Sequence, residues 1–532
     1  MPSTSASSSA VPIVVTAPSS AQRRASRDPF ACIARTGTPS VQGDRAGHSR
    51  RGKIRSAVAG GRPPRRTTLL TMEQVRKEYR PRHKRHGREG LVSRPWQIAG
   101  MAAPMAFAQL LSVLVPISIV AIMGWMSDEA IHVRALYTPL FLLFFAVQTA
   151  FDISNQSLTA LRAGRGEKDQ VSAMLSLGGV WVSAGVVLAG VLSMAAPALA
   201  DVLGAGPDVR GPFVLFLRWM SVANLALIWP VLCASTLRGT KRASQGSAVM
   251  LVCNVVEVGG LAGFGLGTDM GLVAVPLATI IAGGVSGLTG HILLLRAGLL
   301  HPPPGGLWRP EVLGHLLRTG LPVSLSTTVM FGMNFAFLLM LEPFGADVRA
   351  GFTTAGTIQN LVLMPGFVIG SASAILMNQQ RGVGGRRRLT SVLASGLQVT
   401  LIVYCVLVPV LWLLRDSIGH LATGNPRIVE EIGGYFAIVG PSYLTLGLVY
   451  TSVMALQQTG GGVVALSGNA IYVLGTVGIG ALAVHGAASP TPLYVTMSAM
   501  NVCGLVVVIS AFVFLGRQDR RRHAHPGSAQ AR

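Results

Sequence analysis

The feature that most constrains this chain is a series of uncharged apolar runs, each long enough to cross a lipid bilayer. They recur from about residue 97 to residue 516, in a chain that is 50% hydrophobic and 12% charged. An ordinary soluble domain is about 25% charged. A hydrocarbon core about 30 Å thick needs about 20 apolar residues per helical crossing. The sequence therefore predicts an all-α polytopic membrane protein.

We predict twelve transmembrane helices in two six-helix pseudo-symmetric bundles. Several of the runs exceed the minimum length, which tilting in the bilayer can absorb. The predicted helices span residues 97–124, 136–160, 171–200, 212–236, 245–267, 271–296, 312–341, 352–378, 390–414, 430–456, 463–484 and 490–516.

Charged residues in the predicted loops indicate the orientation. Loops on the side of the N-terminus carry 13 Lys and Arg residues, whereas the opposite loops carry only Arg134, Arg210, Arg349, Arg415 and Arg427 and hold most of the loop acids. The excess of positive charge marks the cytoplasmic side. We therefore expect a multi-pass protein of the plasma membrane, monomeric, with both termini in the cytoplasm.

The predicted domains follow from these spans. Residues 1–95 hold 20 Lys and Arg against 5 Asp and Glu and read as a disordered basic cytoplasmic tail. Its expected partner is an anionic membrane surface, not nucleic acid. Met72 resembles a natural start, so an alternative is that residues 1–71 are an over-long gene assignment. Then follow an N-terminal bundle (96–296), a cytoplasmic linker (297–311), a C-terminal bundle (312–516) and a basic tail (517–532).

The positions of several residues indicate an internal duplication. Six helices per half is an even number, so the two halves are parallel repeats, a transporter plan in which two bundles rock around a central site. Interior prolines survive where neighbouring helices or cavity water satisfy the freed carbonyls. Pro104, Pro116 and Pro322 are therefore candidate hinges, with a static packing kink as the alternative. Four landmarks have offsets of 215 to 219 residues: Pro104 with Pro322, Gly166 with Gly382, Leu237 with Leu456, and Asn254 with Asn469.

Four stretches in this order resemble the multidrug and toxic compound extrusion (MATE) transporters. They are "AAPMAFAQLL" in helix 1, "RAGRGEKDQ" after helix 2, "STLRGTKRAS" after helix 4 and "NVVEVGGLAGFGLGTDMGLVAVPLAT" across helices 5 and 6. The resemblance covers residues 97–516. It implies a V-shaped pair of bundles that exports bulky, cationic or amphipathic compounds against an inward flow of H⁺ or Na⁺.

The sequence departs from that family in helix 1, where members commonly carry an aspartate soon after the second proline. The matching part of "PISIVAIMG" has Ser118 and Ile119 instead, and helix 7 offers Asn334 and no acid. Coupling through those carboxylates is therefore in doubt.

Glu257 is the strongest candidate for ion coupling, because an ionisable residue in the middle of a span is costly and a functional hypothesis by default. Asn254 lies three residues earlier, so both side chains share one helical face. A carboxyl group in a low dielectric favours its protonated form and could load and release a proton. The alternative is a structural glutamic acid, permanently protonated or paired with a basic residue.

Asp152 is a further coupling candidate, in a polar face near the cytoplasmic end of helix 2, where it could line the cavity or latch an inner gate. The alternative is a helix end solvated by lipid headgroups. Weaker candidates for cavity lining are amides and a phenol, although interhelical hydrogen bonds of this kind are ordinary in membrane proteins. These are Asn224, Asn334, Gln359, Asn360 and Tyr443.

The alternatives to MATE-type export are a major facilitator-type transporter, a lipid-linked glycan flippase and, more remotely, a membrane-embedded enzyme. A flippase needs basic residues in its cavity. With Arg296 and Arg318 counted among the cytoplasmic loops, Arg218, near one end, is the one Lys or Arg predicted within a span. The sequence contains no HExxH, Walker or GxSxG motif, and its five cysteines are scattered, so we expect no enzyme, metal site or cofactor. The expected ligands are small organic substrates and the coupling ion H⁺ or Na⁺.

Overall fold

A computed structural model describes residues 95–167, 170–300, 310–384 and 388–524, all of them within one unit of the chain. This part of the chain is entirely helical and contains 12 helical spans that are long and apolar enough to cross a membrane. The predicted fold class and helix count are confirmed. The predicted N-terminal tail and most of the linker lie outside the described residues, and the domain boundaries stay a prediction.

Eight of the spans are each built around one main helix, and four are interrupted. The interruptions fall in spans four, seven, ten and twelve. The first half consists of α2 (Pro95–Met126), α3 (Asp128–Arg165), α4 (Gln170–Val202), α5 (Pro207–Ala226), α6 (Ile228–Gly239), α7 (Ala243–Gly267) and α8 (Ala274–Arg296). The second consists of α9 (Pro310–His315), α10 (Leu321–Met340), α11 (Ala346–Val383), α12 (Leu389–Leu413), α13 (Arg415–Ala422), α14 (Pro426–Val439), α15 (Tyr443–Gln458), α16 (Gly462–Val484), α17 (Thr491–Cys503) and α18 (Leu505–Ala524).

The two halves repeat each other in helix length and in helix ends. Helices α3 and α11 both have 38 residues, at an offset of 218 (346 minus 128). Each ends at a glycine in the left-handed region, Gly166 with φ 71° and Gly384 with φ 65°, where the absence of a Cβ removes the strain. Gly166 therefore corresponds to Gly384, and the predicted match with Gly382 was wrong by two residues, because two glycines lie close together there.

A second repeated turn confirms the duplication. After α6 and α15 the chain reaches Thr240 and Thr459, at an offset of 219 (459 minus 240), and each threonine hydroxyl donates to the carbonyl oxygen four residues earlier. The next residues, Lys241 and Gly460, have φ of 66° and 87°. The backbone conformation is thus kept where the residue type differs.

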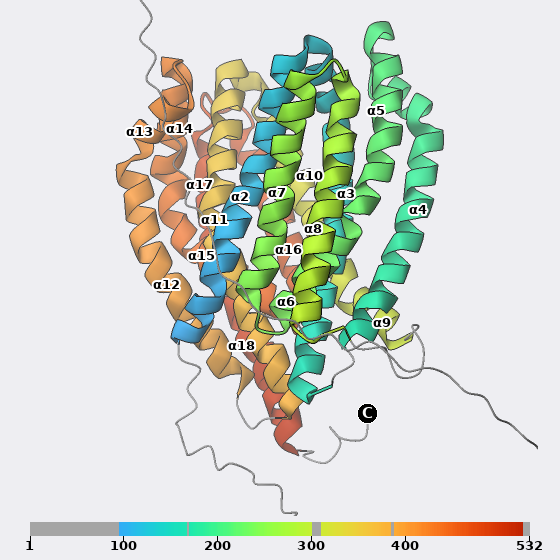
Figure 1. The fold of residues 1–532 in the computed structure, drawn as a ribbon. Coiled ribbons are helices and arrows are strands. Elements are labelled where there is room, and N and C mark those ends of the chain that lie inside the picture. The colour runs from blue at the N-terminus through green and yellow to red at the C-terminus, as the bar shows by residue number, and fades with distance from the viewer. Residues whose placement is uncertain (1–94, 168–169, 301–309, 385–387, 525–532) are drawn as a thin grey trace, which may run out of the picture. The chain divides into compact units, whose positions relative to one another are not determined.

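Helices from the two halves meet along one seam. Helix α2 contacts α11, and α3 contacts both α10 and α11. In Figure 1 α2 stands between α12–α15 on the left and α4, α5 and α8 on the right. The buried side chains at this seam, such as Met105, Ile153, Val323 and Val368, form one hydrophobic cluster with residues of both halves.

The seam closes most tightly at one end, where backbone meets backbone. A Cβ at Gly164 would lie 2.1 Å from the Gln379 carbonyl oxygen, and one at Gly382 would lie 2.2 Å from the Leu161 carbonyl oxygen. The offset of 218 residues relates the two contacts, since it matches Gly164 with Gly382 and Leu161 with Gln379. The closure is therefore pseudo-symmetric, and it lies at the end that the loop charges predict to be cytoplasmic.

The candidate hinge prolines occupy two kinds of position. Pro104 and Pro116 lie inside the unbroken helix α2. Pro322 is in the first turn of α10, directly after a π-helical segment, Leu316–Gly320. Such π-segments are rare and often mark functional sites. Whether any of these prolines acts as a hinge stays a prediction.

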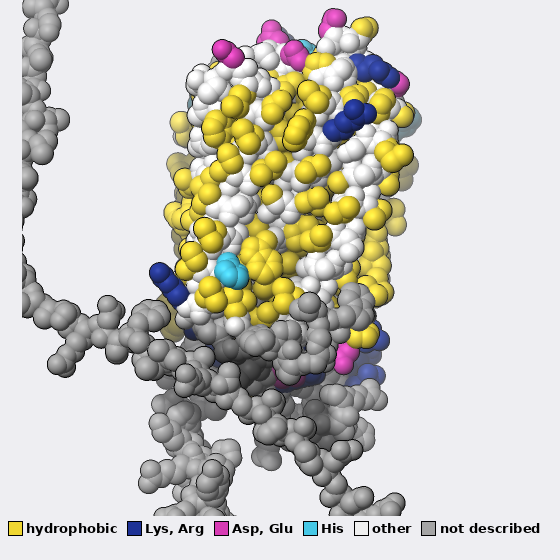
Figure 2. Space-filling model, turned by 45° about the vertical axis from the view of Figure 1, so that its right-hand side comes forward, with side chains coloured by type: hydrophobic (Ala, Val, Ile, Leu, Met, Phe, Trp, Pro, Cys, Tyr) yellow, Lys and Arg dark blue, Asp and Glu magenta, His cyan; other side chains and the backbone are white. Residues whose placement is uncertain are grey.

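The outer surface is suited to lipid. Large exposed hydrophobic side chains follow one another along α4, including Val182, Val186, Val191 and Met194. Figure 2 shows a broad hydrophobic face with acidic side chains gathered at its upper rim. Because lipid tails are apolar, this exposure is what a membrane-spanning surface requires.

Candidate functional site

A cavity of about 930 Å³ opens along the seam between the halves. Its wall is largely apolar and includes Phe141, Phe144, Phe145, Phe331 and Met330. Only four of its described lining residues carry ionisable charge at neutral pH: Arg134, Asp152, Arg238 and Glu257. All four belong to the first half.

The cavity brings together most of the residues that the sequence singled out. Asp152, Asn224, Asn254, Glu257, Asn334, Asn360 and Pro116 line it. Gln359 and Tyr443 differ from the expectation, since neither belongs to the cavity wall. The Gln359 Oε1 atom accepts hydrogen bonds from the hydroxyls of Tyr435 and Tyr443 within an aromatic cluster. Pro104 and Pro322 also lie outside the wall.

Glu257 is held by contacts from a neighbouring helix. The Thr279 hydroxyl of α8 donates to Glu257 Oε1 at 2.9 Å. Asn254, on the same helix as Glu257, donates to the Ser112 hydroxyl of α2 at 2.8 Å. Ser112 in turn donates to the Ala108 carbonyl at 3.0 Å. The predicted pair Asn254 and Glu257 thus faces the cavity, with the amide group fixed against α2.

Arg134 is a cavity residue that the sequence reasoning missed. It was assigned to an outer loop because helix 2 was predicted to begin at residue 136, whereas α3 begins at Asp128. Its side chain is 6% exposed, and its guanidinium carbon lies 5.6 Å and 5.0 Å from the ring centroids of Tyr137 and Phe141. Aromatic faces stabilise a cation at such distances. The Nε atom has no hydrogen-bond partner.

Tyr137 links Arg134 to another predicted residue. The Asn224 amide donates to the Tyr137 hydroxyl at 3.1 Å and to the Met220 carbonyl at 2.7 Å. Tyr137 itself is fully buried. Asn224 therefore fixes the ring on which the arginine rests.

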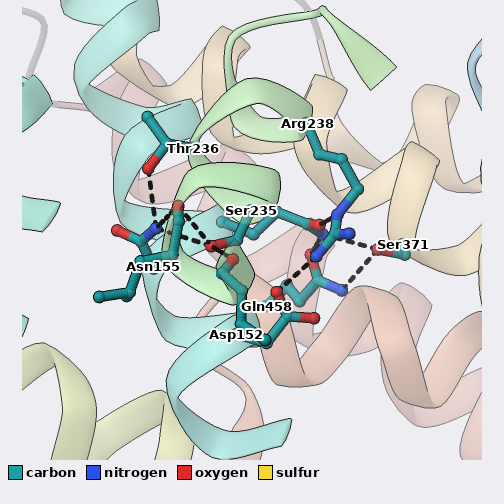
Figure 3. Close-up of polar contacts among 10 residues, drawn as sticks. Asp152, Asn155, Ser235, Thr236, Arg238, Ser371 and Gln458 are labelled. Carbon is teal, nitrogen blue, oxygen red and sulfur yellow. Dashed lines mark hydrogen bonds and ion pairs between the residues drawn. The ribbon is translucent and has the colours of Figure 1, made fainter. Parts of the chain in front are cut away.

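Asp152 and Arg238 form the polar floor of the cavity (Figure 3). Arg238, at the end of α6, donates to the Asp152 carboxylate and, at 2.9 Å, to the Gln156 side-chain carbonyl. Arg238 lies beyond the predicted end of helix 4 at residue 236 and was therefore counted with the loops. The correct partner comes from another helix, so spacing along one helix could not identify it.

Gln156 extends this floor into the second half. Its amide donates to the Ser371 hydroxyl of α11 at 2.7 Å and to the Gln458 side-chain carbonyl of α15 at 3.0 Å. Figure 3 shows these side chains converging from both repeats. Next to them, Asn155 donates to Leu232, Ser235 and Thr236 of α6. The ion pair is thereby connected across the seam.

Within the described residues, no group of three or more His, Cys, Asp or Glu side chains could hold a metal ion. The acids of the cavity are instead placed singly, Asp152 on α3 paired with Arg238 and Glu257 on α7. The fold and this site define a multi-pass membrane protein with two similar halves around a cavity, the architecture of a solute transporter.

The chain belongs to the MATE family of transporters. The family's sequence model, described as MatE, matches residues 104–260 and again residues 322–481. The double match begins at Pro104 and Pro322, the pair that first indicated the duplication. It excludes the major facilitator alternative.

The curated relatives that match this chain are named as multidrug resistance proteins. "Probable multidrug resistance protein NorM" of Thermotoga maritima is 25% identical over 199 residues, which are 36% of this chain and 42% of that protein. "Multidrug resistance protein PmpM" of Pseudomonas aeruginosa is 20% identical over 395 residues, 69% of this chain and 77% of that protein. The matched region thus spans less than half of the first relative's length.

Solved structures show the same fold at low identity. The Vibrio cholerae MATE transporter VcmN in the bent form has a TM-score of 0.75 at 16% identity and covers 80% of this chain and 98% of that chain. A multidrug resistance MATE family transporter in an outward-facing conformation has a TM-score of 0.73 at 18% identity, with 81% and 98% covered. A MOP superfamily transporter from Pyrococcus furiosus has a TM-score of 0.72 at 17% identity, with 81% and 96% covered.

Proposed function

We propose that the protein is a secondary active transporter that exports drug-like or toxic organic compounds by antiport with H⁺ or Na⁺. The observation that carries this proposal is the cavity between the two repeats, with a large apolar wall and the carboxyl group of Glu257 in it. The transporter works from the plasma membrane with both termini in the cytoplasm.

The cavity is suited to organic molecules of drug size. Such ligands occupy pockets of about 300–1,000 Å³ with mostly apolar walls and a few polar groups, and the cavity has about 930 Å³. Phenylalanine and methionine side chains from both halves can repack around different shapes. The names of the curated relatives, multidrug resistance proteins, support the same substrate class.

Alternating access is supported by the seam. The contacts of Gly164 with Gln379 and of Gly382 with Leu161 bring backbone against backbone at one end, and the Gln379 amide donates to the Gly239 carbonyl at 2.8 Å beside them. The bonds from Gln156 to Ser371 and Gln458 cross the seam directly above that closure. Breaking this small set of contacts would let the two halves separate there, which is the rocking motion that parallel repeats permit. Asp152 holds Arg238 and thereby orients Gln156.

In the antiport cycle, Glu257 alternates between its ionised and its loaded form. An ionised carboxylate in the cavity offers a hydrogen-bond acceptor to the polar part of a substrate. Loading it with the coupling ion removes that acceptor and releases the substrate on the other side. Thr279 bonds only one of the two carboxyl oxygens, so the other is open to the ion.

A glycan flippase is less well supported. Two arginines line the cavity, contrary to the sequence prediction of a single basic residue at a span end, but Arg238 is bound to Asp152. With two basic and two acidic residues, the lining has no excess positive charge with which to hold a pyrophosphate.

The test is flux in proteoliposomes loaded with ethidium, a fluorescent organic cation, under an imposed pH or Na⁺ gradient. We expect gradient-driven flux in the unaltered protein and its collapse in Glu257→Gln, with both proteins equally folded by thermal unfolding. Glu342→Gln, an exposed acid outside the cavity, is the matched control and should transport normally. Undiminished flux in Glu257→Gln would remove Glu257 from the mechanism.

A further inference from the structure

The coupling ion follows from the surroundings of Glu257. We infer that Arg134 makes Glu257 a proton site and excludes sodium, so that the antiport proposed above runs on H⁺. This inference rests on the proposed function for its place in a transport cycle. The ion selectivity of Glu257 itself can be tested without transport.

Arg134 places a fixed positive charge next to Glu257. Both side chains line the cavity, and Tyr137 and Phe141, the rings that hold Arg134, belong to the same hydrophobic cluster as Val258 and Ala278, the neighbours of Glu257 and Thr279. No ion pair within 4.0 Å joins Arg134 and Glu257 among the described residues. Arginine stays protonated at every physiological pH. Because the ring faces of Tyr137 and Phe141 hold the guanidinium, its charge cannot swing away to water. Any second cation at Glu257 therefore meets a charge of its own sign.

The charges of the lining residues leave no net negative charge for a metal cation. Asp152 and Arg238 balance each other through their ion pair. Ionised Glu257 is balanced by Arg134, and helix α2 contributes no acid to the cavity wall. The other titratable groups near Glu257 are Tyr137 of α3 and Cys253 of its own helix, both of which are neutral at physiological pH. A sodium ion or a proton at Glu257 would each leave the charge of Arg134 uncompensated in a medium of low dielectric, and only the proton gains a covalent bond in return.

The backbone and serine oxygens beside Glu257 are also engaged in bonds within the protein. Alkali ions in transporters are held by several oxygens, often carbonyls of unwound helix segments. Here α7 runs unbroken from Ala243 to Gly267, so the carbonyls around Glu257 serve helical hydrogen bonds. The Ser112 hydroxyl both accepts from Asn254 and donates to Ala108. A proton needs no such shell, because it forms a covalent bond to one carboxyl oxygen.

The absence of an acid in the cavity part of α2 also favours a proton over a metal ion. A site with two carboxylates and no fixed cation can hold a metal ion, whereas one carboxylate opposite one arginine can only gain or lose a proton. Arg134 also gives the ionised carboxylate a counter-charge, which lets Glu257 release its proton inside the membrane. We therefore assign to Arg134 the role of a selectivity residue that acts through Glu257.

The experiment is infrared difference spectroscopy of the purified full-length protein in detergent, between acidic and alkaline buffers. We expect a protonated-carboxyl band that is missing in Glu257→Gln and that does not change when K⁺ is replaced by Na⁺. In Arg134→Gln, where an amide oxygen replaces the charge, Na⁺ should compete with the proton and shift the pH midpoint of the band by about one unit, a tenfold effect.

Two controls separate charge from side-chain loss. Arg134→Lys keeps the charge and should remain insensitive to Na⁺. Arg218→Gln removes an exposed arginine that bonds the Ser193 carbonyl outside the cavity, and it should also remain insensitive. Sodium sensitivity of the unaltered protein, or a Glu257 band that never titrates, overturns the inference. Sodium insensitivity of a folded Arg134→Gln removes Arg134 from it. If the spectra behave as expected but neither gradient drives flux, the proposed function fails and the selectivity of Glu257 stands.

Discussion

Gly164→Ala offers a direct test of how the seam closes. The added Cβ would lie 2.1 Å from the Gln379 carbonyl oxygen and 2.7 Å from its carbonyl carbon, whereas ordinary contact begins at 3.4 Å. The obstacle is backbone, so no side chain can move aside. Helices α3 and α11 must separate by about 1 Å, and overpacking of this kind costs about 1–3 kcal/mol.

This cost applies only to the closed seam, because the contact is absent when the halves are apart. A change of 1.4 kcal/mol is tenfold in an equilibrium constant. The population closed at this end should therefore fall about 5- to 150-fold relative to the open one. Gly382→Ala should behave in the same way, because its Cβ would lie 2.2 Å from the Leu161 carbonyl oxygen. The double substitution should add little, because either one alone already separates the helices.

Labelling from the predicted cytoplasmic side measures this shift. The five natural cysteines are first changed to Ser, because Cys253 and Cys503 also line the cavity. In that background Val453→Cys places a thiol on the cavity wall, and a membrane-impermeant maleimide applied to inside-out vesicles reports access to it. We expect faster labelling in the Gly164→Ala background and no change with Gly190→Ala, where nothing lies within 4 Å of the added Cβ. Unchanged labelling in both Gly164→Ala and Gly382→Ala, with the proteins folded, would refute the reasoning.

Two further outcomes are expected in thermal unfolding in detergent. Lys241→Gly should raise the free energy of unfolding by about 1 kcal/mol, because Lys241 holds a left-handed φ of 66° that costs a side chain about that much. Gly460→Ala should lower the free energy of unfolding by a similar amount. A change of the same sign in both variants would contradict the duplicated turn. Asp152→Asn should lower the free energy of unfolding by about 2 kcal/mol, because the half-buried Arg238 guanidinium loses a charged hydrogen-bond partner. Adding Arg238→Gln to this variant should restore part of the lost stability. If the second substitution instead lowers the stability by as much as the first, the two residues are not coupled.

The sequence predicted those features that depend on composition and local spacing. Apolar run length gave the twelve spans, since the hydrocarbon core sets a minimum length for each crossing. The three-residue spacing of Asn254 and Glu257 placed both on one helical face, and the structure puts both on the cavity wall. Neither property requires knowledge of which helices become neighbours.

What the sequence could not predict depends on partners from distant segments. Asp152 pairs with Arg238, which lies 86 residues away, and hydropathy treats an arginine near a span end as part of a loop. Arg134 was not identified as a cavity residue for the same reason. Its charge ended the apolar run, although the helix continues for six more residues toward the N-terminus and two aromatic rings cover the guanidinium. A local average of hydropathy cannot register a buried charge that is stabilised by tertiary contacts.

The two halves differ at the residues proposed for ion coupling. At the offset of α3 and α11, Arg134 corresponds to Phe352, which packs against Tyr435 and Tyr494. Counted from the first residues of α7 and α16, Glu257 corresponds to the buried Thr476, and at the 215-residue offset of Asn254 and Asn469 it corresponds to Tyr472. Within the described residues, the second half therefore has no counterpart of the Arg134 and Glu257 pair, and the proposed coupling would use the first half alone.

That asymmetry gives α3 a particular mechanical role. This single helix carries Arg134 beside Glu257, Asp152 on the cavity floor and Gly164 at the closed seam. Thirty residues separate Arg134 from Gly164, a distance of about 45 Å at 1.5 Å per residue. Under the proposed function, we expect a displacement of the Arg134 end, as the charge of Glu257 changes, to be passed along α3, which bends at most at its interior Pro139, and to tilt the Gly164 end against α11. The helix proposed to sense the ion is thus the one whose backbone closes the opposite end of the cavity.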